Sequence, residues 1–325
     1  MPKAKTAAPS GVERIQRPEP LTLRGSTLFE GDALTVLRRL PSGSVRCVVT
    51  SPPYWGLRDY GIEEQIGLEG TMPQFLHRLV AIFAEVRRVL TDDGTLWLNI
   101  GDGYTSGNRG YRATDKKNPA RAMDVRLDTP EGLKPKDLIG IPWRVAFALQ
   151  ADGWYLRQDI IWHKPNPMPE SVTDRCTKAH EYIFMLSKQQ RYYYDSDAVK
   201  EPAVSTDIRK FTDNGADKQR CHSRRHAGFN GRYADKIAEQ GVPETRNRRS
   251  VWTVATRPYK GAHFATFPET LIEPCVLAGS RPADIVLDPF MGSGTTAAVA
   301  KKHGRQYLGC ELNPDYGVLQ QERLK

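Results

Sequence analysis

The 325-residue sequence lacks long apolar runs. No stretch reaches the ~18–20 apolar residues that a membrane-spanning helix requires, so we expect no association with the membrane. The first twenty residues mix Lys, Ala, Pro and Arg and lack the apolar core of a signal peptide. We therefore expect residues 1–24 to form a disordered basic arm and the protein to be cytoplasmic.

Cysteine is scarce and is not arranged as a framework. The five cysteines are an odd number, and none stands in a CxxC pair. This pattern argues against a disulfide-stapled fold and for a reducing compartment. A conceivable zinc set is Cys176, His180, Cys221 and His222. Because these residues lack the compact paired spacing of structural zinc sites, we predict no metal site.

Positive charge is in excess, with 47 Lys and Arg against 38 Asp and Glu and a net charge of +9. Clustered Lys and Arg favour a polyanionic partner, although a basic surface can also serve solubility alone. The basic residues concentrate between 205 and 249, where large apolar residues are few. Such a segment cannot bury much core, so we expect residues 201–250 to be an insert that orders on a partner.

Short apolar runs rich in β-branched residues alternate with segments of helical periodicity. The expected strands are 28–32, 45–50, 95–100 after a turn at 91–94, 155–163, 180–187, 191–194, 285–287 and 306–310. The expected helices are 33–40, 72–90, 141–150, 268–278, 295–303 and 314–324. This alternation predicts an α/β domain with a mostly parallel sheet and helices on both faces. Its halves are residues 25–200, with a flexible loop at 105–136, and residues 251–325.

Two segments far apart in the chain carry most of the chemical information. Ser51-Pro52-Pro53-Tyr54-Trp55 follows the apolar run Val45–Val49, and Asp288–Thr296 follows Ile285–Leu287. Each run reads as a buried strand that ends in a functional loop, and ligands of open α/β sheets bind outside such ends. The first loop is stiffened by prolines and the second is rich in glycine. Together they predict a platform for a flat substrate beside a cofactor site.

These two motifs resemble those of the DNA amino-methyltransferases that use S-adenosylmethionine. Ser51-Pro52-Pro53-Tyr54 precedes Asp288-Pro289-Phe290-x-Gly292-Ser293-Gly294-Thr295-Thr296, which is the order of the permuted β group of that family. The resemblance runs from about Leu28 to the C-terminus and is weakest between about 205 and 249. It implies a Rossmann-like methyltransferase fold with an inserted target-recognition region.

The glycine-rich segment is the expected cofactor site. A strand followed by Gly292-x-Gly294 at the start of a helix lets backbone N–H groups approach a ligand closely. The resemblance implies that Glu311 binds the ribose hydroxyls, Asp32 the adenine amino group and Thr266 the carboxylate end of S-adenosylmethionine. Asp32 also suits the N-cap of the following helix. The full expected set is Asp32, Thr266, Phe267, Asp288, Pro289, Phe290, Gly292, Ser293, Gly294, Thr295, Glu311 and Asn313; Asp102 is a further candidate.

Methylation of an exocyclic amino group requires acceptors for its N–H groups, because its lone pair is delocalised into the ring. The Ser51 hydroxyl and the Pro52 carbonyl suit this role, and the fixed φ of Pro52 and Pro53 sets where the carbonyls point. Tyr54 is placed to stack on a base that has left the duplex. We therefore expect direct methyl transfer with catalytic residues Ser51, Pro52, Pro53 and Tyr54.

Two rival chemistries fit the sequence less well. A dinucleotide site would show Gly-x-Gly-x-x-Gly, but Ala297 stands at the third position. A carbon-5 cytosine methyltransferase needs a cysteine nucleophile on a Pro-Cys loop after the cofactor motif. Pro274-Cys275 stands before that motif inside an apolar helix, so we expect Cys275 to be a core residue.

The resemblance implies a site-specific enzyme for double-stranded DNA from a bacterial or phage modification system, acting as a monomer or homodimer. A cognate restriction endonuclease would act separately. Ser at position 51 favours N4 of cytosine, since Asp or Asn is commoner there in N6-adenine enzymes. N6-adenine methylation, RNA or protein substrates and a non-catalytic DNA-binding relative remain alternatives. The expected DNA contacts are Trp55, Arg175, Lys178, Arg224, Arg225 and Arg248.

Overall fold

The computed structural model describes residues 21, 25–57, 59, 61–62, 64–105, 129–203, 239–241, 243–257 and 266–325. The main sheet contains β1 (Thr27–Glu30), β2 (Val45–Thr50), β3 (Leu90–Ile100), β4 (Tyr155–His163), β5 (His180–Ser187), β8 (Val251–Thr253), β9 (Ile285–Asp288) and β10 (Gln306–Glu311). Their order is β1-β10-β9-β2-β3-β5-β4-β8. Neighbouring strands run parallel except that β5 is antiparallel to both β3 and β4. The expected mostly parallel α/β fold is confirmed.

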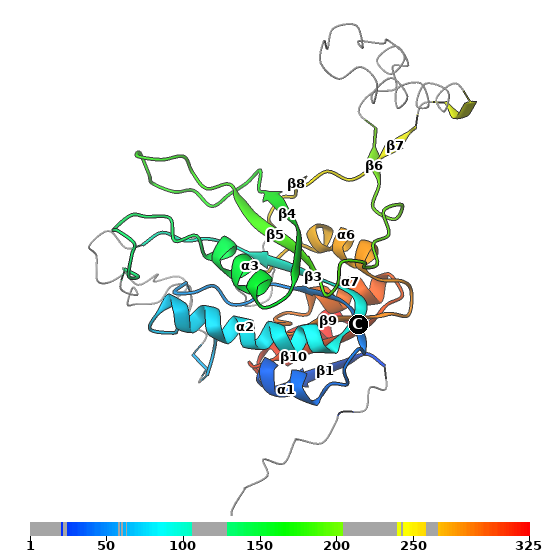
Figure 1. Ribbon diagram of the computed structural model, residues 1–325, viewed down its shortest axis with the longest axis horizontal. Helices are drawn as coiled ribbons and strands as arrows, with labels where there is room; N and C mark the ends of the chain where they lie inside the picture. The colour runs from blue at the N-terminus through cyan, green and yellow to red at the C-terminus, as the bar shows by residue number, and fades with distance from the viewer. Residues whose placement is uncertain are drawn as a thin grey trace, which may run out of the picture.

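Helices cover both faces of this sheet (Figure 1). The described helices are α1 (Ala33–Arg39), α2 (Met72–Val89), α3 (Ile141–Ala151), α6 (Glu269–Gly279), α7 (Thr295–Lys302) and α8 (Tyr316–Arg323). In β2, Val48 packs in the core with α1, α2 and α3, whereas Cys47 and Val49 pack in a second core with α6 and α7. Burial on both faces explains why β2 is a continuous apolar run. Within the described ranges, no helix combines the length and apolar character needed to cross a membrane.

The carboxyl ends of the parallel strands meet along one edge of the sheet. Glu30 of β1 pairs with Glu311 of β10, and Thr50 of β2 pairs with Leu98 of β3. Because β5 runs in the opposite direction, its first residues, including Glu181, join the same edge. Both motif loops therefore leave the sheet where ligands bind in open α/β folds.

Two expected element assignments need correction. The predicted strand at 191–194 is absent from this described segment, where Tyr193 donates its N–H to the Asp93 carbonyl at 2.9 Å. Tyr194 instead stacks on Trp97 with ring centroids 6.4 Å apart. Aromatic residues favour strands, but here they pack as separate side chains on an irregular segment.

Strand β3 begins earlier than predicted. Leu90 pairs with Val45, and Thr95 pairs with Cys47, so the expected turn at 91–94 is an irregularity inside the strand. The extra residues are accommodated as a shift in register rather than as a break in pairing.

Three short strands were not predicted. β6 (Glu201–Pro202) and β7 (Thr245–Arg246) pair antiparallel as a ribbon that stands away from the main sheet (Figure 1). β8 extends the main sheet beside β4 and carries Trp252 into the second core. Most of the arm at 1–24, the loop at 105–136 and the insert at 201–250 lie outside the described residues.

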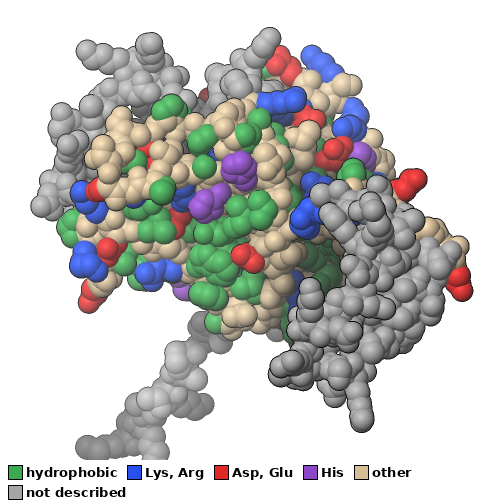
Figure 2. Space-filling view, turned by 90° about the horizontal axis from the view of Figure 1, so that it is seen from above, with side chains coloured by type: hydrophobic (Ala, Val, Ile, Leu, Met, Phe, Trp, Pro, Cys, Tyr) green, Lys and Arg blue, Asp and Glu red, His purple; other side chains and the backbone are tan. Residues whose placement is uncertain are grey.

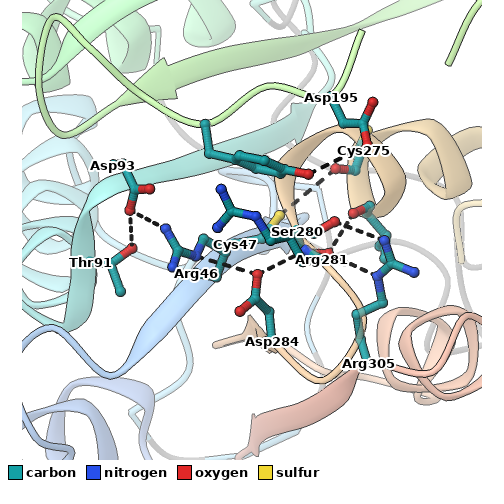
Figure 3. A network of polar contacts seen from close by, with 12 residues as sticks. Arg46, Cys47, Thr91, Asp93, Asp195, Cys275, Ser280, Arg281, Asp284 and Arg305 are labelled. Atoms are coloured by element: carbon teal, nitrogen blue, oxygen red, sulfur yellow. Dashed lines mark hydrogen bonds and ion pairs between the residues drawn. The ribbon is translucent and has the colours of Figure 1, made fainter. Parts of the chain in front are cut away.

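A polar network ties the opposite edge of the sheet together (Figure 3). Arg46, near the start of β2, forms ion pairs with Asp93 and with Asp284, the latter at 3.4 Å. Arg305 donates from its guanidinium to the carbonyl and hydroxyl of Ser280, at 2.8 and 3.2 Å. The network joins segments before and after the insert at the edge away from the motif loops.

Candidate active site

The two motif loops are joined by one buried carboxylate. Asp288, at the end of β9, is 1% exposed. Its Oδ1 accepts from the Thr50 hydroxyl at 2.5 Å, and its Oδ2 accepts from the Thr296 hydroxyl at 2.7 Å. Thr50 immediately precedes Ser51, and Thr296 lies in the first turn of α7. Asp288 therefore fixes the start of the proline loop against the glycine-rich loop.

Burial raises the pKa of Asp288 to about 6, against hydrogen bonds from Thr50 and Thr296 that lower it. Since its oxygens are occupied by these donors and by the Phe290 N–H at 3.0 Å, Asp288 positions the site. Its direct contact with the cofactor stays a prediction. Pro289 is buried behind it, and Phe290 packs on the first core.

The glycine-rich loop adopts backbone conformations that require glycine. Gly292 has φ of 53°, and Gly294, the N-cap of α7, has φ of 85°. Side chains with a Cβ rarely adopt this region, so the sequence places glycine at both positions. The side chains of Ser293 and Thr295 are buried and accept hydrogen bonds from Arg323, the former at 2.9 Å. The hydroxyls of Ser293 and Thr295 are therefore engaged by Arg323, and their contact with a cofactor stays a prediction.

Helix α8 supports this loop from behind. The side-chain amide of Gln320 donates to the Gly292 carbonyl at 2.8 Å. Gln320 is buried, and its Cβ and Cγ would lie within ordinary contact of a Cβ at Gly294. Sequence reasoning missed Gln320 and Arg323 because both stand in a short amphipathic helix without a motif.

Glu311 has a fixed orientation at the end of β10. Its Oε2 accepts from the Gly292 N–H at 2.7 Å, and its Oε1 accepts from the Asn313 N–H at 2.8 Å. Burial raises the pKa of Glu311, while these backbone donors lower it. The contact of this carboxylate with ribose hydroxyls, which the family resemblance implies, stays a prediction. Asn313 contributes its backbone, and its side chain accepts from the Asp315 N–H.

The other expected cofactor residues are placed as follows. Asp32 caps α1, because its Oδ1 accepts from the N–H and hydroxyl of Thr35, each at 2.9 Å. Gly31, beside Asp32, donates its N–H to the Glu311 carbonyl at 2.7 Å, which brings the ends of β1 and β10 together. Thr266 and Phe267 precede α6, with Phe267 packed on the second core. Their contact with a cofactor stays a prediction.

Asp102 caps the N-terminus of a helix. Its carboxylate accepts from the Gly140 N–H at 3.0 Å and from the Ile141 N–H at 3.1 Å, so a residue at the end of β3 caps α3. Cys275 is fully buried in α6, and burial raises the pKa of its thiol well above the ordinary value. This placement agrees with a core role for Cys275 and not with a nucleophile.

The proline loop brings Ser51 and Tyr54 against β5. The Ser51 hydroxyl lies 3.5 Å from the Tyr54 hydroxyl, which donates to Glu181 Oε2 at 2.9 Å. Pro52 is buried and Pro53 is half-buried. Glu181 is paired with Lys164, whose Nζ lies 2.5 Å from Oε1. Sequence reasoning missed Glu181 and Lys164, because no motif marks them and only the antiparallel β5 brings them here.

Trp55 does not fit its predicted DNA contact. It is 8% exposed and belongs to the first core, and its indole N–H donates to the Glu69 carbonyl at 2.9 Å. Trp55 therefore anchors the loop from inside.

Two of the predicted DNA contacts are half-buried beside the site. Arg175 donates to Glu170 at 2.7 Å and stacks over Tyr104 at 4.0 Å. Lys178 donates to the Asp102 carbonyl at 2.9 Å, and burial lowers the pKa of this lysine. Both cations stand on the segment between β4 and β5, near the edge that carries the motif loops. Their contact with DNA stays a prediction.

Arg248 stands beside the β6–β7 ribbon with its guanidinium 4.7 Å from the centre of the Trp252 ring. It lines an open cavity of about 590 Å³ together with Gln158, Glu201, Arg246, Arg249, Ser250 and Val251. Arg224 and Arg225 lie outside the described residues. Figure 2 shows Lys and Arg side chains dispersed over the described part of one face rather than gathered in a single patch.

Comparison with known proteins identifies the class. The sequence pattern of the DNA methylase family matches residues 45–321. Type II methyltransferase M.XycI of Xanthomonas campestris pv. cyanopsidis is 67% identical over all of this chain and 96% of that relative. Type II methyltransferase M.Cfr9I of Citrobacter freundii is 62% identical over the same shares.

Solved structures share the fold. The PvuII DNA methyltransferase (cytosine-N4-specific) superposes with a TM-score of 0.61 at 18% identity, covering 94% of this chain and 88% of that one. A putative DNA modification methylase of Thermus thermophilus, solved with S-adenosyl-L-methionine, gives a TM-score of 0.55 at 26% identity, covering 92% of this chain and 93% of that one.

The fold and the two joined motif loops define an α/β methyltransferase. This chain belongs to the DNA methylase family, and the resemblance to the β group of DNA amino-methyltransferases is confirmed.

Proposed function

We propose that this DNA methyltransferase transfers a methyl group to the exocyclic N4 of cytosine in double-stranded DNA. S-adenosylmethionine is the methyl donor, and its sulfonium makes the methyl group electrophilic. The observation that supports the proposal most strongly is the clasp formed by Thr50, Asp288 and Thr296, with distances of 2.5 and 2.7 Å. It sets Ser51 directly beside the glycine-rich loop.

In this mechanism the target base leaves the duplex and stacks on Tyr54. The Ser51 hydroxyl and the Pro52 carbonyl accept the two amino N–H groups and favour a tetrahedral nitrogen. Glu311 would bind the ribose hydroxyls of S-adenosylmethionine, and the backbone of Gly292 to Thr295 would hold its methionine portion. Methyl transfer would be an in-line displacement in which the bond from N4 to the methyl carbon forms as the S–C bond breaks, S-adenosylhomocysteine leaves and the nitrogen loses one proton to solvent. No covalent enzyme intermediate is required, so positioning supplies most of the rate.

The base assignment rests on Ser51, because Asp or Asn is commoner at this position in N6-adenine enzymes of the family. N6-adenine methylation is the alternative, with the same geometry. Arg175, Lys178, Arg248 and the residues of the 201–250 insert would contact DNA phosphates and base edges. Type II relatives favour a cytoplasmic modification enzyme that protects DNA from a separate restriction endonuclease.

The test is incubation of the purified protein with S-adenosylmethionine and unmethylated plasmid, followed by digestion to nucleosides and mass spectrometry. N4-methylcytosine is the expected product. N6-methyladenine would overturn the base assignment and keep the mechanism. Neither product, together with weak cofactor binding in a calorimetric titration, would favour a non-catalytic DNA-binding relative. Neither product with tight cofactor binding would direct the search to RNA and protein substrates.

A further inference from the structure

Tyr54 is the middle of a hydrogen-bond chain that ends on a carboxylate outside the motif. Ser51 donates to the Tyr54 oxygen at 3.5 Å, and Tyr54 donates to Glu181 Oε2 at 2.9 Å. Glu181 stands near the start of β5, two strands away from β2 in the sheet. The chain thus links the catalytic loop to a strand that runs in the opposite direction.

Glu181 is held in place by an ion pair and a hydrogen bond from its neighbours. Lys164 Nζ lies 2.5 Å from Oε1, with both side chains less than one-fifth exposed. The Asn99 amide donates to Oε2 at 3.4 Å. Lys164 also lies over the Trp162 ring at 4.2 Å. Because a partly buried ion pair that loses one member leaves an uncompensated charge, the carboxylate and the ammonium depend on each other.

Tyr54 and Glu181 both pack closely against the backbone of Gly101, the residue after β3. A Cβ at Gly101 would lie 2.7 Å from Tyr54 Cε2 and 3.2 Å from the Glu181 carboxyl carbon. Glycine at this position therefore lets the ring and the carboxylate pack together against the backbone. A larger residue at this position would displace Tyr54 or Glu181 from the arrangement in which they meet.

The carboxylate sets the direction of every hydrogen bond in the chain. A carboxylate in an ion pair only accepts hydrogen bonds, so the Tyr54 hydroxyl must donate its one hydrogen bond to Glu181. Burial and the nearby Glu181 raise the pKa of Tyr54 well above its ordinary value, so this proton is retained at neutral pH. The Tyr54 oxygen can then only accept from Ser51. The Ser51 hydroxyl therefore donates its hydrogen bond to Tyr54, and its oxygen lone pairs stay available to accept from a ligand.

We propose that Glu181 is a positioning residue that makes Ser51 a hydrogen-bond acceptor for the amino group of the target base. This inference rests on the proposed function, because only an amino-group substrate presents N–H donors to Ser51. It also assigns Tyr54 a second role beside stacking. Because the Tyr54 hydroxyl donates to Glu181, it accepts from Ser51, and this fixes the direction of the Ser51 hydrogen bond.

The test compares Glu181→Gln, Tyr54→Phe and the double variant by steady-state methyl transfer to DNA. Gln keeps the shape of Glu181, but its amide can turn an N–H toward Tyr54, so the direction of the chain is no longer enforced. We expect kcat to fall about 10–100-fold in each single variant, with KM for DNA near the wild-type value. The double variant should be no slower than Tyr54→Phe, because both changes break the same chain.

Glu273→Gln is the matched control, since Glu273 also forms an ion pair with a lysine, Lys302 at 2.8 Å, and lies 2.6 Å from His303 Nε2, away from the motif loops. It should keep the wild-type kcat. Calorimetric titration should give the same S-adenosylmethionine affinity for all variants. If Glu181→Gln has a lowered melting temperature, Tyr54→Phe, which removes only the hydroxyl, carries the test.

Wild-type kcat in Glu181→Gln or in Tyr54→Phe would overturn the inference. The inference would also be overturned if the kcat values showed independent effects. In that case the double variant would be slower than Tyr54→Phe by the same factor by which Glu181→Gln is slower than wild type, and Glu181 would act independently of Tyr54. Failure of the proposed function is distinguishable, since the wild-type enzyme itself would then transfer no methyl group to DNA.

Discussion

At the scale of single residues, Asp288 connects the two loops through its protonation state as well as its position. The Thr296 hydroxyl lies within hydrogen-bond distance of both Asp288 Oδ2, at 2.7 Å, and the Val49 carbonyl, at 3.2 Å. One hydroxyl proton cannot serve both acceptors fully. When Asp288 is protonated, it donates to Thr296, and Thr296 donates to Val49. With Asp288 protonated, Asp288, the Thr296 hydroxyl and the Val49 carbonyl can therefore all be hydrogen-bonded at once.

We predict that Asp288→Asn folds and changes the pH dependence of stability. The folded pKa of about 6 lies above the ordinary 3.8, so the native state holds a proton that the unfolded chain loses. The stabilisation from this group is full below about pH 4 and is lost as the pH rises through 6. The free energy of unfolding of Asp288→Asn relative to wild type should therefore rise by up to ~3 kcal/mol from pH 4 to pH 7. Urea unfolding at both pH values measures it.

Asp152→Asn, at an exposed position after α3, is the control and should show a constant difference. A constant difference for Asp288→Asn as well would contradict the account. Asp288→Ala leaves the Thr50 hydroxyl and the Phe290 N–H without their acceptor, whereas the Thr296 hydroxyl keeps the Val49 carbonyl, and it should lower stability by about 3 kcal/mol.

Ser51→Ala should lose methyl transfer while it keeps the cofactor. The variant removes an acceptor for the amino group but leaves Asp288, Gly292 and Glu311 unchanged. We expect kcat to fall about 100–1,000-fold, as for the loss of one preorganised hydrogen-bonding group, with unchanged affinity for S-adenosylmethionine. Ser42→Ala, at an exposed position on the opposite edge, should behave as wild type. Substantial activity in Ser51→Ala would mean that the Pro52 carbonyl suffices.

Single residues were predictable where a motif marks them. Ser51, Asp288 and Glu311 were singled out by their motifs and by the strands before them, and the structure places Asp288 in the clasp between the two motif loops. Glu181 and Lys164 could not be predicted as site residues, because a charged residue at the end of an apolar strand is not by itself evidence of an active-site role. Only the sheet order shows that they meet the catalytic loop.

At the scale of elements, the glycine-rich loop owes its shape to α8. Gln320→Ala removes the hydrogen bond to the Gly292 carbonyl and the packing of Gln320 on Gly294. We predict about tenfold weaker binding of S-adenosylmethionine, equivalent to ~1.4 kcal/mol, with little change in kcat at saturating cofactor. Calorimetric titration measures the affinity. Unchanged affinity would show that the loop holds its shape without α8; Gln321→Ala, an exposed neighbour, is the control.

Elements with strong local patterns had predictable boundaries. β2, β4 and β5 have the predicted bounds because long apolar or β-branched runs end at turns. β6, β7 and β8 are two or three residues long, too short for a periodic pattern. They form through pairing with distant partners, which single-sequence reasoning does not detect.

At the scale of the whole molecule, we expect the two edges of the sheet to have different roles, one in catalysis and the other in stability. The motif loops lie at the carboxyl ends of the strands, and the Arg46 and Arg305 network lies at the opposite edge (Figure 3). We predict that Arg305→Met lowers the free energy of unfolding by about 2 kcal/mol, because it removes hydrogen bonds to Ser280 and to the His303 carbonyl.

The kcat of Arg305→Met should equal that of wild type at a temperature where both are folded. Urea unfolding and methyl transfer measured side by side test this separation. Arg191→Met, at an exposed position after β5, serves as the control for stability. A large loss of kcat without loss of stability would contradict the division between the two edges.

The architecture was predictable because the alternation of apolar strands and helices is a property of the entire chain. The antiparallel placement of β5 was not, because an apolar strand has the same sequence pattern in either direction. That direction is what brings Glu181 to Tyr54.

The central claim is that Ser51 and the glycine-rich loop form one centre that methylates N4 of cytosine. Its most direct test is expression of the protein in a host without DNA methylation, followed by mass spectrometry of nucleosides from genomic DNA. N4-methylcytosine should appear with the wild-type protein and be absent with Ser51→Ala at equal expression. N6-methyladenine, or N4-methylcytosine at the same level with Ser51→Ala, would contradict the account.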